Sequence, residues 1–438
     1  MRSDDCWEAD AQSIDARKGY PLTDTRQLGL SPHARTILIW MCALIAANQL
    51  GFGAVVPVIA LYAEDFGVSQ TAIGLTIAIY GLARFLINVP AGQLADRFGR
   101  KTTLALGGAV TVAGTVLCAV APNYAVFLVA RFIAGAGAAF VLTGGQIVLA
   151  DIASPQNRGR VMAIYQGVFL FSVGAGSFPG GWLAAHVSLG SPFWANAGLA
   201  AIVTLLALLF VPETRPAAHA EISPETASSG EEKRLTFGQQ LSLLVATPGF
   251  LLISVVSFVA FFARTGGLFN VIPLLADDHI GLEPDEIGFG IGMISVVGLL
   301  LVYPSGALVD RFGRKAVIVP SALLSAGAMM LFAFAGSFAT FLVASFCWSI
   351  ATGVAGAAPA AYAVDVAPRG LVAPAMGMYR TIADLGYVVG PVLLGFISDL
   401  HSPITALVVT SALLLASGMV FALRAPESLP GRLKSAPA

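Results

Sequence analysis

Long stretches without a single charged residue dominate this sequence. They cover residues 36–63, 102–130, 161–212, 235–263 and 316–364. A helix needs about 20 apolar residues to cross the hydrocarbon core of a bilayer, so each stretch is long enough for one or two crossings. Only 11% of the residues are charged, against about 25% in soluble domains. Because a chain in lipid must satisfy its backbone hydrogen bonds internally, these stretches predict an all-α membrane protein with several crossings.

A short motif occurs twice, at matching places in the two halves of the chain. It reads GQLADRFGRK from Gly92 to Lys101 and GALVDRFGRK from Gly306 to Lys315. The offset between the two copies also relates other identical pairs: Pro90 and Pro304, Asp151 and Asp365, Tyr165 and Tyr379, and Gly176 and Gly390. The sequence therefore predicts two homologous halves, each with a polar loop whose glycines permit a tight turn.

Twelve membrane-crossing helices fit the apolar pattern. They are predicted near residues 36–62, 71–94, 102–121, 124–149, 161–186, 192–211, 248–275, 286–308, 316–336, 338–363, 371–398 and 402–423. Residues 36–211 then form an N-terminal half of six helices, and residues 248–424 form a C-terminal half. The segment 212–247, rich in Pro, Ser and Glu, is predicted to be a linker. Residues 1–35 and 425–438 are predicted to be tails.

The basic residues predict the orientation of the chain. Of the 24 Lys and Arg, only Arg84, Arg131, Arg264 and Arg380 fall inside predicted helices, and the others lie in alternate loops, the linker and the tails. The remaining loops carry acidic charges only: Glu64, Asp65, Asp277, Asp278, Glu283, Asp285, Glu286 and Asp399. Because Lys and Arg are enriched on the cytoplasmic side, both termini are predicted to be cytoplasmic, in a plasma or inner membrane.

The duplicated loop resembles the signature motif of the major facilitator superfamily of transporters. The resemblance covers roughly residues 36–424 and implies two pseudo-symmetric six-helix halves. It also implies that the loop aspartates help to lock the cytoplasmic side when the transporter opens outward; a loop that only sets topology is the alternative. The gating residues expected on this basis are Gly92, Asp96, Arg97, Gly99, Arg100, Lys101, Asp151, Gly306, Asp310, Arg311, Gly313, Arg314, Lys315 and Asp365.

Two further patterns bear on the transport path. ARFIAGAGAAF, from Ala130 to Phe140, resembles the RxxxGxG pattern of drug-extruding facilitators. VGAGSFPGGW, from Val173 to Trp182, departs from the GxxxGPxxGG pattern of antiporters because Ser177 takes the place of the proline. Arg131 is predicted to face the cavity, the alternative being a side chain that extends to the membrane interface. The expected cavity residues are Asn48, Gln49, Arg131, Gln166, Arg264, Asn270, Trp348 and Tyr362.

Asp384 is the one carboxylate that the predicted helices place deep in the membrane. Burial disfavours the charged form of a carboxylate, so a cation is expected beside it. In the resembled fold the second and eleventh helices meet between the halves, which makes Arg84 the expected principal partner. Arg380, four residues before Asp384, shares its helix face and is expected to join. Protonation of Asp384 would release Arg84, so Asp384 is the expected proton-coupling residue.

The motifs absent from the sequence exclude other classes of function. It has no phosphate-binding GxxxxGK[ST] loop, metal-ligand cluster or nucleophile elbow. The protein is therefore not expected to be an enzyme, to bind a cofactor or metal, or to have a nucleic-acid partner. The favoured prediction is a monomeric secondary transporter that works by alternating access and exports small organic molecules in exchange for protons. Proton-coupled import of a small organic anion is the first alternative, because Arg131 and Arg264 suit a carboxylate. A non-transporting membrane sensor is less favoured.

Overall fold

Helices make up all the regular secondary structure that the computed structural model describes, which covers residues 30–154, 157–214, 237–368 and 371–427. Within these residues, 12 helices are long and apolar enough to cross a membrane. The predicted all-α membrane fold is therefore confirmed. Each predicted crossing coincides with one of these helices, or with a helix and its direct continuation.

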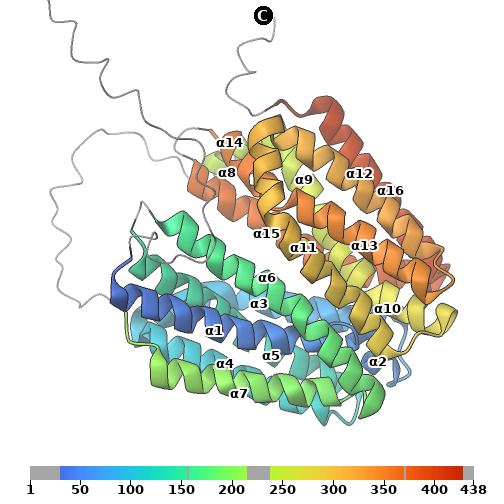
Figure 1. Ribbon diagram of the computed structural model, residues 1–438, viewed down its shortest axis with the longest axis horizontal. Helices are drawn as coiled ribbons and strands as arrows, with labels where there is room; N and C mark the ends of the chain where they lie inside the picture. The colour runs from blue at the N-terminus through green and yellow to red at the C-terminus, as the bar shows by residue number, and fades with distance from the viewer. Residues whose placement is uncertain (1–29, 155–156, 215–236, 369–370, 428–438) are drawn as a thin grey trace, which may run out of the picture.

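The N-terminal half is the lower, blue-to-green group of helices in Figure 1. It contains α1 (Pro32–Val55), α2 (Ile59–Glu64), α3 (Gln70–Phe98), α4 (Arg100–Ala119), α5 (Tyr124–Ile152), α6 (Arg158–His186) and α7 (Ser191–Phe210). The chain turns at Val56–Val58 between α1 and α2, since Pro57 cannot continue a helix without distortion. Together α1 and α2 correspond to the first predicted crossing.

The C-terminal half is the upper, yellow-to-red group in Figure 1, and the short helix α8 (Phe237–Ala246) precedes it. Its elements are α9 (Pro248–Phe262), η3 (Ala263–Val271), α10 (Ile272–Leu275), η4 (Ala276–Ile280), α11 (Pro284–Phe312), α12 (Arg314–Ala333), α13 (Phe338–Ala355), α14 (Ala358–Asp365), α15 (Val372–Leu400) and α16 (Pro403–Arg424). The segments η3 and η4 are π-helical, a local widening of the helix that is frequent at functional sites.

Each copy of the repeated motif forms the turn between two crossings. Gly99 ends α3 and begins α4 with φ 99°, and Gly313 ends α11 and begins α12 with φ 97°. Residues with a side chain rarely adopt this backbone conformation, so the glycine of each DRFGRK sequence makes a one-residue connection. We call the end of the bundle that carries Gly99 and Gly313 the motif end. The other end, which carries Glu64 and Asp278, is the acidic end.

Side-chain caps explain where several helices begin at the acidic end. The Ser69 hydroxyl accepts a hydrogen bond from the Ala72 N–H at the start of α3 (3.3 Å). Asn123 does the same for Val126 in α5 (3.0 Å), and Ser402 for Thr405 in α16 (3.1 Å). Such caps satisfy N–H groups that have no partner within the helix.

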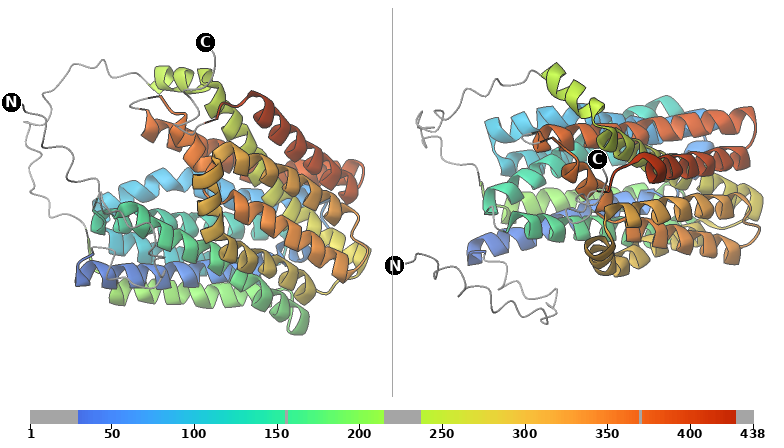
Figure 2. Two further views of the ribbon diagram at one scale, coloured as in Figure 1. Left: turned by 45° about the horizontal axis from the view of Figure 1, so that its top comes forward. Right: turned by 90° about the horizontal axis from the view of Figure 1, so that it is seen from above.

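Four helices form the boundary between the halves, which the left view of Figure 2 also shows as two groups. Helix α3 packs against α15, and α6 packs against α11. Glycines permit this close approach at the acidic end: a side chain at Gly74 would collide with the Pro391 carbonyl oxygen, and one at Gly181 would collide with that of Pro284. The halves are therefore in backbone contact at the acidic end.

The same four helices separate toward the motif end. No atom lies within 4 Å of the position that a side chain at Gly92, Gly306 or Gly377 would occupy. In Figure 1 the two groups of helices converge toward α2 and α10 and spread toward α8 and α14. The structure is thus closed at the acidic end and open at the motif end.

Candidate functional site

A polar cavity of ≈ 120 Å³ lies between the two halves, and we call it the central cavity. Helices α1, α3, α5 and α6 line it from one half, and α9, η3 and α15 line it from the other. Six of the residues expected to form a site contribute to its wall: Gln49, Arg84, Gln166, Arg264, Arg380 and Asp384. Because the halves part at the motif end, the cavity opens in that direction.

Positive charge exceeds negative charge in the central cavity. Its described wall contains three guanidinium groups, those of Arg84, Arg264 and Arg380, and one carboxylate, that of Asp384. Asp384 Oδ2 lies 3.9 Å from Arg380 Nε, four residues earlier on α15. Arg84 and Arg264 have no carboxylate within 4.0 Å among the described residues. The cavity therefore offers two cations that are not neutralised by a neighbouring acid.

Aromatic rings take the place of acids beside these two arginines. The Arg84 guanidinium carbon lies 5.9 Å from the centre of the Tyr387 ring, and that of Arg264 lies 5.7 Å from the Phe269 ring. A cation near the face of an aromatic ring gains about 0.5–2 kcal/mol, much less than burial of a charge costs. Arg84 Nε is buried without a hydrogen-bond partner in the described structure. Both arginines are thus available to a ligand.

The predicted ion pair between Arg84 and Asp384 is wrong for this structure. Asp384 pairs with Arg380 instead, which the prediction placed second. Both arginines line the same cavity as Asp384, but Arg84 turns toward Tyr387, one helical turn farther along α15. Arg380 needs no contact between helices to reach Asp384, because residues four apart share a helix face.

Arg131 is not in the wall of the central cavity, but it lines a smaller hollow of ≈ 10 Å³ between the halves together with Phe269 and Tyr387. Its predicted position beside the transport path therefore stays a prediction. Its Nε donates a hydrogen bond to the Thr76 carbonyl (3.2 Å), and its guanidinium carbon lies 4.5 Å from the Tyr80 ring centre. The side chain is 3% exposed, so it does not extend to the membrane interface either. Tyr80, which contacts this guanidinium, also lines the central cavity.

Three other expected cavity residues are occupied with packing. Asn48 donates a hydrogen bond to its neighbour Gln49 (2.8 Å), and Asn270 donates to the Pro391 carbonyl (3.2 Å). Tyr362 is fully buried near the motif end, where its hydroxyl donates to the Pro426 carbonyl (2.7 Å). None of the three residues lines the central cavity, which corrects the cavity prediction for them. Each donates a hydrogen bond within its own half, although Asn270 Oδ1 is buried without a partner in the described structure.

Trp348 lines two hollows beside the central cavity. One, of ≈ 220 Å³, lies inside the C-terminal half among α9, η3 and α12 to α16, and we call it the C-half chamber. The other, of ≈ 140 Å³, lies where α6 passes α11. Arg264 contributes to the walls of both hollows and to the central cavity. The π-helical segment η3 therefore places this arginine where the three spaces meet.

The motif of the N-terminal half forms a charge network inside that half. Arg100 lies 3.0 Å from Asp151 at the end of α5 and 3.2 Å from Asp96 on α3, and it also donates to the Ala95 carbonyl. Asp151 also accepts a hydrogen bond from the Thr214 hydroxyl (3.0 Å). The Asp96 side chain is 73% exposed, so it remains free to meet other groups when the motif end closes.

The second copy of the motif repeats part of this arrangement. Arg314 lies 2.9 Å from Asp365 at the end of α14, and Lys315 Nζ donates to the Ala425 carbonyl (2.7 Å). Arg97 and Arg311 each stack on the phenylalanine that follows in the sequence. The side chain of Asp310 lies outside the described residues. Each half thus joins its motif turn to the end of its own fourth helix.

The sequence motifs do not include three further residues of the site. The Glu213 carboxylate accepts hydrogen bonds from the backbone N–H groups of Arg100 (2.9 Å) and Lys101 (3.3 Å), which caps α4 beside Gly99. A sequence feature that could have indicated Glu213 is the segment VPET at 211–214, because a similar segment, APES, follows the second half at 425–428. Tyr80 and Tyr387 enter the cavity wall. Tyr80 lies four residues before Arg84 and Tyr387 three residues after Asp384, the two residues of the predicted ion pair, and such spacings share a helix face.

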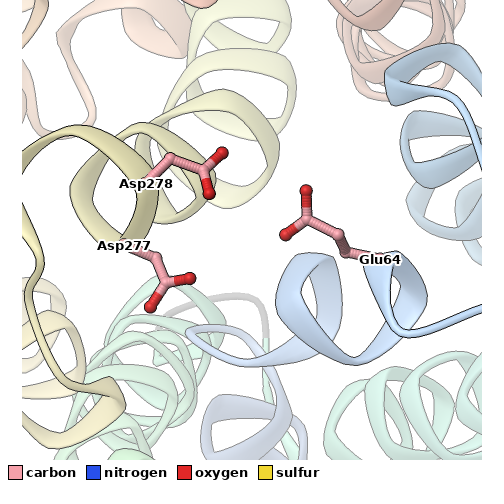
Figure 3. Close-up of side chains that lie close together, drawn as sticks. All are labelled: Glu64, Asp277 and Asp278. Atoms are coloured by element: carbon pink, nitrogen blue, oxygen red, sulfur yellow. The ribbon is translucent and has the colours of Figure 1, made fainter. Parts of the chain in front are cut away.

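Three carboxylates gather at the acidic end, as Figure 3 shows. Glu64 from the N-terminal half faces Asp277 and Asp278 from the C-terminal half, with carboxylate oxygens within 4.8 Å of one another. Glu64 lies beyond the first crossing. Burial, reinforced by the charges of Asp278, Asp277 and Asp65, raises the pKa of Glu64 to about 7. Closure at this end therefore brings like charges together across the boundary.

Two six-crossing halves around a polar cavity are the architecture of a membrane transporter. The sequence agrees: the family model of the Major Facilitator Superfamily matches residues 41–279 and 253–438. The chain belongs to this superfamily.

Similar proteins include two that carry names referring to drug resistance. Multidrug resistance protein 2 of Bacillus subtilis (strain 168) is 26% identical over 378 residues, which cover 84% of this chain and 90% of that protein. Quinolone resistance protein NorA of Staphylococcus aureus is 24% identical over 359 residues, or 80% and 87% of the two chains. Among solved structures, a bacterial homologue of the human lysosomal transporter Spinster, in an inward-facing and occupied conformation, shares the fold with a TM-score of 0.69 and 18% identity, covering 90% of this chain and 97% of that one.

Proposed function

We propose that this protein is a proton-coupled exporter of small organic molecules that works by alternating access. The observation that carries the proposal is the central cavity, which lies between two halves that touch at one end only and which contains Asp384 as the single carboxylate of its described wall. The names of the two bacterial relatives, which refer to multidrug and quinolone resistance, support export.

Alternation requires a second set of contacts at the motif end. The boundary helices carry glycines there, among them Gly92 on α3, Gly306 on α11 and Gly377 on α15, at which an added Cβ would meet no neighbouring element in this conformation. Glycines at the acidic end of the same helices are in backbone contact. A glycine in an exposed helix interior costs about 1 kcal/mol relative to alanine, so unused glycines at a boundary support a role in the opposite state.

Proton coupling is assigned to Asp384. Its carboxylate lies in the path between the halves, and its one ion-pair partner within 4.0 Å, Arg380, is on the same helix. Protonation frees Arg380 from Asp384, and the cavity then becomes more positive. A change of charge at this place alters the free energy of a substrate bound in the cavity, which is the coupling that an antiporter requires.

The membrane orientation follows from the distribution of basic residues. All the Lys and Arg outside the crossings fall in the tails, the linker and the motif-end loops, so we assign the motif end to the cytoplasm. On this assignment the structure is the cytoplasm-open state of a plasma or inner-membrane protein. Substrate would enter the central cavity from the cytoplasm.

Import of a small organic anion by proton symport is the second candidate. Arg84 and Arg264 favour it, because two unneutralised guanidinium groups face the cavity and guanidinium binds carboxylates in a bidentate manner. Both candidates use the same cavity and the same carboxylate. They differ in the direction in which substrate moves relative to the proton.

Transport by purified protein in proteoliposomes tests the proposal. A pH gradient is imposed, and the fluxes of ethidium, a lipophilic cation, and of 2-naphthoate, an organic anion, are followed with the gradient in each direction. Export by antiport predicts that a probe moves against the proton flow, whereas symport predicts movement with it. If the fluxes of both probes are independent of the pH gradient in both directions, proton coupling is contradicted.

A further inference from the structure

The C-half chamber has the features of a binding site that belongs to one half alone. Its described wall comes entirely from the C-terminal half. Apolar side chains of several helices form most of it, among them Val256, Ile318, Trp348 and Leu414. Arg264 is the one charged residue among its described lining. The chamber is therefore an apolar space with a cation at the boundary that it shares with the central cavity.

Three donor groups on the chamber wall have no acceptor among the described residues. Ser321 is 5% exposed, and its hydroxyl has no hydrogen-bond partner among the described residues. The Ser257 hydroxyl donates to the Tyr379 hydroxyl (2.7 Å), which leaves the Tyr379 proton for another acceptor. Arg264 has neither an ion pair nor a hydrogen bond in the described structure. Burial of a hydroxyl without a partner is unfavourable, so Ser321, together with the free donors of Arg264 and Tyr379, points to an absent acceptor.

We infer that the C-half chamber binds the apolar body of an organic monoanion whose carboxylate contacts Arg264. This inference rests on the proposed function, because it takes the connected central cavity as the route of substrate. A carboxylate matches the unpartnered donors, since it accepts only and binds guanidinium in a bidentate manner. A cation is disfavoured, because no acid is among the described lining residues of the chamber.

The size of the chamber restricts the ligand. Its ≈ 220 Å³ is below the range of about 300–1,000 Å³ typical of sites for drug-sized molecules. A fused pair of aromatic rings or a short alkyl chain is therefore a better match than a large drug. A longer ligand would extend past Arg264 into the central cavity, whose wall shares that residue.

The two residues that characterise this site, Arg264 and Trp348, are not repeated at the matching positions of the N-terminal half. At the offset that relates the two halves, Arg264 corresponds to Leu50 and Trp348 to Ala134. Because its described wall comes from the C-terminal half alone, the chamber should move with that half during alternation. Its walls stay together while the boundary between the halves rearranges, and a bound anion can remain in place as access changes sides.

Equilibrium binding to purified full-length protein in nanodiscs, without any gradient, tests this inference. The probes share one ring system and differ in charge: 2-naphthoate, 2-naphthalenemethanol and 2-naphthylmethylammonium. Calorimetry should show that naphthoate binds at least about tenfold more tightly than the other two, the scale of one charge-assisted hydrogen bond. Arg264→Gln should remove that preference, and Arg264→Lys should retain part of it.

Matched variants locate the ligand. Ser321→Leu fills the chamber and should weaken naphthoate binding about tenfold or more, and Ser417→Leu, also on the chamber wall, serves as a second filler if the first variant does not fold. Arg84→Gln, which alters the central cavity alone, should have a much smaller effect. Equal affinity for the three probes would overturn the inference. So would an unchanged affinity in folded chamber-filled protein together with a large loss in Arg84→Gln, because the anion would then lie in the central cavity.

The outcome separates this inference from the proposed function. Gradient-driven transport of any probe, combined with no binding preference for naphthoate, would contradict the anion chamber and leave proton-coupled transport intact. Tight naphthoate binding through Arg264, combined with no gradient-driven flux of any probe, would contradict the transport proposal and leave the chamber intact.

Discussion

Asp399, at the end of α15, caps the start of α3 across the boundary between the halves. Its Oδ1 accepts a hydrogen bond from the Gln70 N–H (2.8 Å), and its Oδ2 accepts from the Thr71 N–H (2.9 Å). The carboxylate also lies at the positive end of the α3 dipole. A helix cap normally belongs to the chain segment just before the helix. Here the other half of the protein supplies part of it, so the cap exists only while the acidic end is closed.

The first prediction is that Asp399→Ala shifts the protein away from this conformation. Loss of a capping side chain costs about 0.5–2 kcal/mol, and here the cost falls on the closed acidic end alone. Spin labels at the exposed positions Val187 and Phe334, one in each half at the acidic end, report the separation. The distance distribution should gain a longer component in the variant. An unchanged distribution would mean that the cap contributes nothing to closure.

The second prediction concerns the unused glycines. Gly92→Leu should leave folding intact, because a Cβ at this position meets nothing within 4 Å. It should obstruct closure of the motif end and reduce transport at least about tenfold, the effect of a few kcal/mol of overpacking. Gly198→Leu on α7 is the matched control, since it too has open space around it but lies outside the boundary helices. Equal transport by the two folded variants would remove the assigned role of Gly92.

The third prediction separates stability from gating within the motif. Arg100→Ala should destabilise the protein by about 3 kcal/mol, the lower end for a broken buried pair, because the Arg100 side chain is 8% exposed and holds both Asp151 and Asp96. Asp96→Asn should cost little stability, since the Asp96 side chain is 73% exposed, yet should reduce transport. Thermal unfolding and flux are measured on the same preparations. Full activity of Asp96→Asn would leave Asp96 with no gating role.

The fourth prediction is a pH dependence at the acidic end. The Glu64 pKa is raised to about 7 when that end is closed, first by burial and then by Asp278 and Asp277. Because the pKa of Glu64 returns to its ordinary, lower value when the halves separate, the closed state binds the extra proton. Closure is therefore favoured at low pH and weakened as the pH rises through about 7.

Spin-label distances at Val187 and Phe334, recorded between pH 5 and 8, measure this dependence. The wild type should close on acidification, and Glu64→Gln should stay closed over the whole range. A wild-type pH profile that persists unchanged in Glu64→Gln would place the titrating group elsewhere.

The fold was predictable because the bilayer leaves few choices. Crossing length, the repeat and the placement of basic residues predict the twelve crossings, and each reflects a strong physical constraint. The motif turn was also predictable, since a single glycine at Gly99 or Gly313 permits the positive φ that joins two helices. These features depend on composition and local backbone chemistry, which a sequence records directly.

The roles of isolated polar residues were harder to predict. A polar side chain in a crossing can face a cavity or bond to a neighbouring backbone carbonyl, and the sequence does not distinguish the two. Arg131 and Asn270 bond to carbonyls, whereas Gln166 and Arg264 reach the cavity. The partner of Asp384 depends on the rotation of α3 relative to α15, and a sequence carries no direct record of that angle.

The fifth prediction is that Asp384 couples protons to transport. A comparison of two fluxes tests it. Wild-type protein and Asp384→Asn are reconstituted in parallel, and two fluxes are compared: accumulation of a transported probe driven by a pH gradient, and exchange of labelled for unlabelled probe without a gradient. The wild type should show both. Asp384→Asn should keep exchange, because the cavity and its packing remain, and should lose gradient-driven accumulation. Accumulation by Asp384→Asn at the wild-type level, with the wild-type dependence on pH, would contradict the account.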